Sequence, residues 1–242
     1  MPQSNSITTR LKLCGRSFTE ISYPRDLPLI YHAFTNRHTH RLPTEVWSVV
    51  GLTHGYLSER EAGFLYWAAR NWPVEGPIIE LGSLEGRSTL VFALGGRCVH
   101  AVDAWSSDVG DISALRKQRT PEESYARFKH NLENAGVASM VVTHRGRTDT
   151  IGMSWHTIAA ILYIDAGHGY EDISRDLVVW LPHLHRHGLL LMHDVLGHGY
   201  RGVTRAASEL LRHGWRVVGS AGSLVAFTRS AENAVADQEG MV

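Results

Sequence analysis

The sequence has few cysteines and no long apolar segment. Two cysteines, Cys14 and Cys98, occur among 242 residues, one in a polar N-terminal segment and one at the start of an apolar run. This spacing favours free thiols over a disulfide framework. No apolar stretch approaches the roughly 20 residues that span a bilayer, and the N-terminal MPQSNSITTR lacks the apolar core of a secretory signal. We therefore expect a soluble chain in a reducing cytoplasm, with no membrane partner.

An excess of charge of either sign is also missing. Lys plus Arg and Asp plus Glu number 24 each. The chain therefore has no overall basic field that would recruit nucleic acid, and no acidic excess typical of a disordered chain. We found no internal repeat and no low-complexity tract. The length allows one sizeable α/β domain with an extension.

The first 50 residues show little periodicity. Prolines interrupt them at Pro24, Pro28 and Pro43, and basic residues outnumber acidic ones. We expect residues 1–50 to form an irregular arm or lid, which either packs on the surface or covers a substrate. Such an arm could also exchange between the subunits of a homo-oligomer.

The pattern changes at Ser58. Glu61 follows it at the spacing of a capping box, and apolar residues then recur at helical intervals, which predicts a helix before the first strand. At the other end, residues 229–242 are rich in Ala, Glu, Asp and Gln and are expected to be disordered. The main domain is therefore expected over residues 51–228.

Strand and helix patterns alternate along this domain with short connections, which is typical of a parallel sheet with helices on both faces. The expected strands are 77–81, 98–103, 140–144, 158–165, 188–193, 215–219 and 223–228. The expected helices between them are 86–93, 121–135, 148–155, 170–184 and 202–213. Only SAG separates the last two strands, which is too short for a crossover, so these strands must pair antiparallel. We predict an α/β three-layer sandwich whose mostly parallel, seven-stranded sheet ends in a C-terminal antiparallel hairpin.

Four expected strands in succession finish on an acid. Glu80 and Asp103 end the first two, and Asp165 and Asp194 end the apolar runs AAILYID and GLLLMHD. The carboxyl ends of parallel strands lie on one edge of the sheet, where open α/β folds bind ligands. We therefore expect a ligand site at this edge.

A glycine turn follows the first strand in IIELGSLEGRST. Gly82 lets the chain leave the strand with unusual dihedrals, and Gly86 permits a ligand to approach the backbone at the start of a helix. The G-x-G-x-x-G spacing of dinucleotide-binding folds is absent, which argues against a nicotinamide-dependent oxidoreductase. The wider spacing suits a nucleoside ligand whose ribose Asp103 could bind, although a generic strand-to-helix loop would have the same composition.

IIELGSLEGRST followed by VHAVDAW resembles motifs one and two of class I S-adenosylmethionine-dependent methyltransferases, from about residue 51 to residue 228. The resemblance implies a Rossmann-like fold in which the turn holds the methionine part of the cofactor and the acid after the second strand binds ribose. The implied cofactor-binding residues are Glu80, Gly82, Ser83, Gly86 and Ser88 near the methionine, Asp103 at the ribose, Ala104 and Trp105 beside the adenine, and Asp165 in the pocket. The loop HRGRTDTI adds residues 146–148, Thr148 among them, on the adenine side.

The stretch IDAGHGYEDISRDLVVWLPHLHRHGLLLMHDV resembles small-molecule O-methyltransferases related to macrocin O-methyltransferase, several of which use Mg²⁺. In that family the fourth and fifth strands are neighbours, so Asp165 and Asp194 would lie little more than ~4.8 Å apart. Carboxylates that close repel each other unless a cation or a proton lies between them. We predict a Mg²⁺ site formed by Asp165 and Asp194, with a neutral His193 as a third ligand where relatives can carry a carboxylate. The alternative is that Asp194 bonds backbone amides and Asp165 only lines the cofactor pocket.

His168 follows Asp165 by three residues. A histidine can accept a proton near neutral pH, and methyl transfer to an alcohol needs the hydroxyl proton removed as the oxygen attacks the methyl carbon. We predict that His168 and Asp165 are the catalytic residues. The alternative for His168 is a histidine that caps the helix expected near Tyr170.

Other histidines are weaker candidates. His183, His185 and His187 lie in the connection that enters the fifth strand, on the edge away from the acids, which argues against a zinc site. His198 and Tyr200 follow Asp194 on the ligand edge and could contact a substrate.

Together these features predict an S-adenosylmethionine-dependent O-methyltransferase that acts on a small hydroxylated metabolite, such as a sugar or a glycosylated natural product, with help from a divalent metal. Two alternatives stay open at this point: a metal-independent methyltransferase with an oxygen or nitrogen acceptor, and a protein that binds the cofactor without catalysis.

Overall fold

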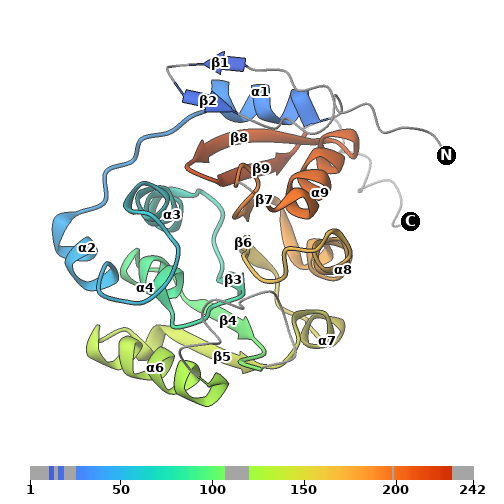
Figure 1. The fold of residues 1–242 in the computed structure, drawn as a ribbon. Coiled ribbons are helices and arrows are strands. Elements are labelled where there is room, and N and C mark those ends of the chain that lie inside the picture. Colours follow the sequence, from blue (N-terminus) through green and yellow to red (C-terminus); the bar gives the residue numbers. More distant parts are fainter. Residues whose placement is uncertain (1–10, 14–15, 19–25, 107–119, 198, 231–242) are drawn as a thin grey trace.

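The computed structural model describes residues 11–13, 16–18, 26–106, 120–197 and 199–230. A seven-stranded sheet forms the centre of the molecule (Figure 1), in the order β5-β4-β3-β6-β7-β9-β8. Its strands are β3 (Ile78–Leu81), β4 (Val99–Asp103), β5 (Val141–Arg145), β6 (Ala159–Ile164), β7 (Leu184–Met192), β8 (Trp215–Ala221) and β9 (Leu224–Arg229). The first five are parallel, and β9 pairs antiparallel with both β7 and β8. The predicted fold, including the C-terminal hairpin, is confirmed.

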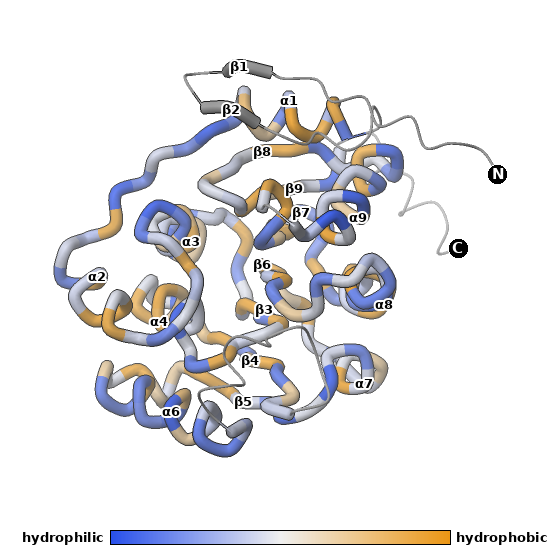
Figure 2. Tube along the Cα trace, viewed as in Figure 1, coloured by the Kyte–Doolittle hydropathy of each residue, from blue (hydrophilic) through white to orange (hydrophobic). Residues whose placement is uncertain are grey.

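Helices cover both faces of the sheet (Figure 1). One face carries α3 (Glu59–Asn71), α4 (Arg87–Leu94) and α6 (Pro121–Asn134), and the other carries α7 (Thr148–Met153), α8 (Tyr170–Trp180) and α9 (Arg201–Arg212). Each face has its own apolar cluster. Figure 2 shows hydrophobic residues on the strands and hydrophilic residues on the outer turns of the helices. All residues of β3 and β6 are buried, as expected for parallel strands enclosed between two helix layers.

The expectation of an irregular N-terminal arm is wrong for the described residues. Besides β1 (Leu11–Leu13) and β2 (Arg16–Phe18), this region forms α1 (Leu27–Thr35) and α2 (Thr44–Val50). Pro28 and Pro43 do not interrupt these helices but lie at their starts, where a missing N–H group costs nothing. Helix α1 contacts β8, and its Leu29 and Ala33 are fully buried. The segment therefore completes the core.

Several boundaries differ from those expected. The helix predicted over 170–184 ends at Trp180 and is followed by a 3₁₀ turn, Leu181–His183. Strand β7 starts at Leu184, so His185 and His187 lie in the strand, at the end opposite Asp194. His198, residues 107–119 and the tail over 231–242 lie outside the described residues.

Cys98 is an exposed free thiol. Among the described residues, no helix has both the length and the apolar character needed to cross a membrane.

Candidate active site

The carboxyl ends of β3, β4, β6 and β7 meet at one edge of the sheet. Asp165 and Asp194 follow the neighbouring strands β6 and β7, as predicted from the sequence. Among the described residues, three that are not glycine have a left-handed φ: Leu84 at 48°, Trp105 at 39° and Asp194 at 58°. All three follow strands at this edge. Such strained conformations cluster at functional sites, which supports the choice of this edge.

Glu80 is hydrogen-bonded to the glycine turn and to the start of α4. It is fully buried and accepts hydrogen bonds from the hydroxyls of Ser83 and Ser88, at 2.7 Å and 2.5 Å, and from that of Thr89. Burial raises the pKa of Glu80 to about 7, although these three hydroxyls oppose the rise. The carboxyl is directed into the protein, so it shapes the turn that was predicted to hold the cofactor.

The two glycines of the turn are required by different neighbours. Gly82 has a φ of 88°, and a Cβ there would lie 2.2 Å from the carbonyl oxygen of Asp165. Gly82 therefore lets the turn pack against the loop after β6. Gly86 has a φ of 89°, and its Cβ would lie 3.0 Å from the ring of Phe128. The conformation and this ring require a glycine at position 86, and the approach of a ligand there stays a prediction.

Asp103 fastens the glycine turn to the loop after β4. Its Oδ2 accepts the N–H groups of Ser83 and Leu84, each at 2.9 Å, and its Oδ1 accepts the N–H of Trp105 at 2.8 Å. The indole N–H of Trp105 donates to the carbonyl of Leu84 at 2.6 Å. An ionised carboxylate can accept about four hydrogen bonds, so capacity remains for a ribose hydroxyl.

Packing alters which of the predicted residues can contact the adenine. Trp105 is only 4% exposed and lies against Tyr125 and Phe128, with ring centroids 4.8 Å and 4.9 Å away. This burial conflicts with the prediction that its ring flanks the adenine, and Trp105 instead supports the loop from inside. The neighbouring Ala104 is half-buried and stays a candidate.

Thr148, the other adenine-side candidate, is bonded to helix α8. Its hydroxyl donates to Oδ1 of Asp176 at 2.6 Å. Asp176 is itself buried, which raises its pKa to about 6. The hydroxyl proton of Thr148 is therefore committed, and its carbonyl accepts the indole N–H of Trp180 at 3.1 Å, so the predicted contact with the adenine stays a prediction.

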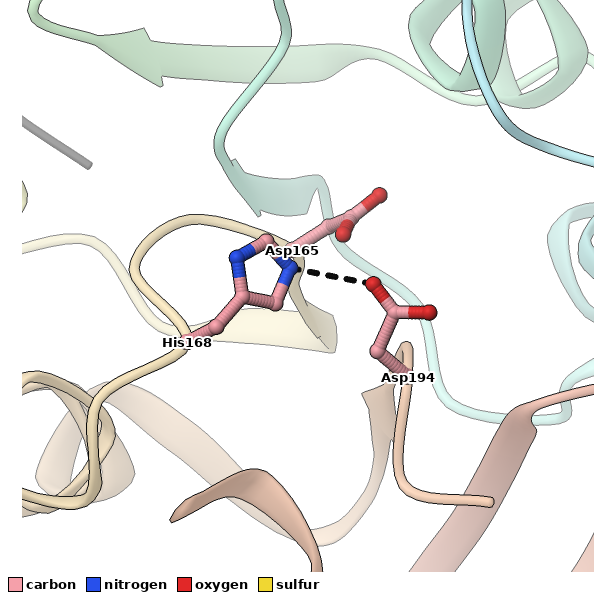
Figure 3. A group of neighbouring side chains, drawn as sticks. All are labelled: Asp165, His168 and Asp194. Atoms are coloured by element: carbon pink, nitrogen blue, oxygen red, sulfur yellow. Dashed lines mark hydrogen bonds and ion pairs between the residues drawn. The ribbon is translucent and has the colours of Figure 1, made fainter. Parts of the chain in front are cut away.

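Asp165, His168 and Asp194 come together at the edge (Figure 3). Each offers one ligand atom, and these atoms lie within 4.8 Å of one another. Nε2 of His168 is 3.0 Å from Oδ2 of Asp194, and the hydroxyl of Tyr163 donates to Oδ2 of Asp165 at 2.9 Å. The three side chains are between 19% and 25% exposed, so a ligand can reach them.

The loop that carries His168 is held by the start of α9. The ring of His168 stacks on that of Tyr200, with centroids 4.2 Å apart. A Cβ on Gly202 would lie 2.6 Å from the carbonyl oxygen of His168, so only glycine permits this close packing. Tyr200 therefore lies beside the predicted catalytic histidine.

His193 lies on the buried side of the two aspartates and is only 5% exposed. Its Nδ1 is 3.3 Å from Oδ1 of Asp165 and 3.4 Å from Oδ2 of Asp194. Burial lowers the pKa of His193, but the nearby carboxylates of Asp165, Asp194 and Glu61 outweigh it and hold the pKa well above its usual value. The three residues whose ligand atoms come together include His168 and not His193, so His193 as a metal ligand stays a prediction.

The same contacts act on Asp194. Burial raises its pKa, but the hydrogen bond with His168 and the close approach of the His193 ring hold the pKa well below the usual range. Asp194 is therefore an anion at neutral pH.

Several contacts in and around the site have no signal in the sequence, among them those of Glu61 and Arg87. Glu61 contacts His193, with Oε1 and Nε2 3.5 Å apart, but the Ser58–Glu61 spacing predicts only a helix start. Arg87 donates to the carbonyl of Gly55 at 2.5 Å and so holds the segment before α3 against the start of α4. No sequence signal points to this contact of Arg87.

Comparison with known proteins agrees with this geometry. Residues 79–195 match the family described as Methyltransferase domain. The O-methyltransferase NovP is 17% identical, with a TM-score of 0.57 over 85% of this chain and 98% of that chain. The S-adenosylhomocysteine-bound methyltransferase PaMTH1 of Podospora anserina is 13% identical, with a TM-score of 0.59 over 89% and 99%. TomG of Streptomyces achromogenes, an O-methyltransferase involved in tomaymycin synthesis and solved with S-adenosylmethionine, is 16% identical, with a TM-score of 0.56 over 85% and 96%.

At these identities the structural likeness shows the fold, and the family match adds the domain. The matched segment includes the glycine turn, Asp103, Asp165 and Asp194. The sheet order, with its antiparallel last pair, is the one expected from the sequence resemblance. Residues 79–195 therefore match a methyltransferase domain, and the described chain has the fold of the methyltransferases named above.

Proposed function

We propose that this enzyme transfers the methyl group of S-adenosylmethionine to a hydroxyl oxygen of a small metabolite. The observation that carries the proposal is the group of Asp165, His168 and Asp194, which lies on the same sheet edge as the glycine turn. A cofactor held by the turn, with its ribose at Asp103, would present its sulfonium methyl toward this group. The acceptor hydroxyl would then lie between the methyl group and the three side chains.

His168 is the base in this proposal. Its Nε2 bonds to Asp194, so the carboxylate orients the ring and stabilises the imidazolium that forms. Figure 3 shows Nδ1 of His168 turned away from Asp194. That nitrogen takes the hydroxyl proton as the oxygen attacks the methyl carbon, and the carbon–sulfur bond breaks to release S-adenosylhomocysteine. The alternative role of His168 as a helix cap has less support, because Gly169 is the N-cap of α8 and the ring of His168 bonds to Asp194.

The donor set also fits a divalent cation such as Mg²⁺. Two carboxylates and one imidazole within 4.8 Å can ligate an ion together, and hard cations prefer carboxylate oxygens. When bound, such an ion would acidify and orient an acceptor hydroxyl. Asp165, His168 and Asp194 would hold it.

One observation favours a metal-independent version of the same reaction. The ring of His193 lies against both aspartates and provides a positive charge from the buried side. That charge offsets part of the repulsion that a metal would otherwise relieve. We therefore keep transfer by the His168–Asp194 pair without metal as the second candidate.

For the acceptor we propose a sugar or a glycosylated natural product. The role of TomG in tomaymycin synthesis supports a natural product as the acceptor, and the names of NovP and TomG support transfer to oxygen. The site itself adds that the acceptor must bring a hydroxyl to two carboxylates and a histidine.

The test uses ¹³C-methyl-labelled S-adenosylmethionine with a panel of sugars, glycosides and catechols, read by ¹³C NMR. A methoxy signal is expected, and it should be lost in Asp165→Asn. A signal from an N-methyl group would contradict oxygen as the acceptor. Dialysis against EDTA followed by Mg²⁺ distinguishes the two candidates, because only the metal-assisted reaction is lost and restored. S-adenosylhomocysteine binding without transfer to any acceptor would favour a non-catalytic protein.

A further inference from the structure

We propose that Glu61, on the helix before the first strand, is a positioning residue of the active site and acts through His193 on Asp165 and Asp194. The proposal rests on the proposed function, because it assigns those aspartates to the reaction. Glu61 lies outside the matched segment 79–195 and 132 residues before His193. Its role is visible only in the folded chain.

His193 provides the first contact in this chain of residues. Its ring lies at the back of the site, with Nδ1 nearly equidistant from one oxygen of Asp165 and one of Asp194, at 3.3 Å and 3.4 Å. No acceptor reaches this buried nitrogen with good hydrogen-bond geometry. A small rotation of the ring would bring Nδ1 closer to one carboxylate and farther from the other. Whatever holds the ring therefore sets the spacing of both aspartates.

Glu61 holds the other side of the ring. Its Oε1 is 3.5 Å from Nε2 of His193 and accepts both the N–H and the hydroxyl of Ser223 at 2.8 Å. Its Oε2 accepts the N–H of Ser58 at 2.9 Å and the hydroxyl at 2.6 Å. A Cβ on Gly222 would lie 2.4 Å from Oε1, so the β8–β9 turn encloses the carboxylate. Four donors from two elements fix Glu61, and Glu61 in turn fixes the ring.

Helix capping alone does not explain this arrangement. The start of α6 has the same capping box, formed by Thr120 and Glu123, and there the glutamate is exposed. Glu61 is 4% exposed, and burying a carboxylate is costly unless its partners compensate. The cap uses only Oε2, whereas Oε1 is directed to the hairpin turn and to His193. The buried carboxylate of Glu61 therefore links α3 to the active site.

The test compares Glu61→Gln with Ser58→Ala in the full-length protein bound to S-adenosylhomocysteine. The glutamine side chain keeps the size and the cap but loses the carboxylate that faces His193. Ser58→Ala removes the hydroxyl from the same cap, while the N–H of residue 58 and both donors of Ser223 still hold Glu61 against His193. We expect Glu61→Gln to shift the imidazole ¹⁵N signals of His193 and, through Asp194, of His168. Ser58→Ala should lower Tm without moving either signal.

Kinetics give a second readout with any acceptor found in the panel. Removal of a residue that orients a catalytic group typically costs ten- to hundred-fold, so we expect kcat of Glu61→Gln to fall by roughly that factor. The Kd for S-adenosylhomocysteine should stay within about twofold, and Ser58→Ala should keep its kcat. If Glu61 acts through His193, the double variant Glu61→Gln/His193→Gln should be no slower than His193→Gln alone.

Unchanged His168 signals in Glu61→Gln, or a kcat equal to that of Ser58→Ala, would overturn the proposal. The NMR comparison requires no acceptor. Failure to find an acceptor would therefore count against the proposed function, while the His168 signals would still decide the role of Glu61.

Discussion

Replacing Asp103 by Asn tests the most connected residue of the predicted cofactor site. The carboxylate accepts three backbone N–H groups, from Ser83, Leu84 and Trp105, at 2.8–2.9 Å. An asparagine oxygen can keep the bonds to Ser83 and Leu84, but each loses its charge assistance, about 1 kcal/mol. The amide NH₂ then faces the N–H of Trp105, which costs roughly 2 kcal/mol for a lost charged bond.

The expected destabilisation is therefore about 4 kcal/mol. In a chain of this size each 1 kcal/mol lowers Tm by roughly 2–4 °C, so we expect a fall of about 8–16 °C by calorimetry. The matched control is Asp172→Asn, which removes an exposed ion pair with Arg175 and should change Tm by no more than about 2 °C.

The same variant tests ribose binding. Loss of a charge-assisted bond to a ribose hydroxyl should weaken S-adenosylhomocysteine binding about ten- to hundred-fold, measured by titration calorimetry well below Tm. A lower Tm with unchanged affinity would refute ribose binding by Asp103. A Tm equal to that of the wild type would refute its role in fastening the turn.

Two further substitutions, Glu80→Gln and Gly82→Ala, test the residues that shape the glycine turn. Because burial raises the pKa of Glu80 from 4.5 to about 7, the stability that depends on its protonated form is present below pH 4.5 and is lost as the pH rises through 7. Urea unfolding should show the wild type losing about 3 kcal/mol more than Glu80→Gln over that window, and parallel pH profiles would contradict the assignment. Gly82→Ala should cost roughly 3 kcal/mol or more, because its Cβ would meet Asp165, whereas Gly96→Ala, with a φ of 93° and no atom within 4 Å, should cost about 1–2 kcal/mol. Equal losses in the two variants would mean that packing against Asp165 is unimportant.

The sheet could be predicted because its signals are local. Apolar runs such as that of β6 have the length of buried strands, and the three residues SAG are too short for anything but a hairpin. Helix α1 could not be predicted in the same way. Its buried Leu29 and Ala33 are covered by elements that include β8, nearly 190 residues later, and no local pattern reveals that partner.

The site was predictable to the level of strand ends and no further. Asp165 and Asp194 follow from two apolar runs and the strand order. The letters His193–Asp194 do not tell which side chain turns outward, and here Asp194 takes a φ of 58° and faces the edge while His193 faces the core. The burial of Trp105 depends on α6, which begins only at Pro121.

The most direct test of the central claim is a crystal structure of the enzyme with S-adenosylhomocysteine and Mg²⁺. We expect the ligand to lie along the glycine turn, with a ribose hydroxyl on Asp103 and its sulfur directed toward Asp165, His168 and Asp194. Density for an ion among those three side chains would support the metal-assisted reaction. A ligand elsewhere, or a sulfur directed away from the three residues, would contradict the account.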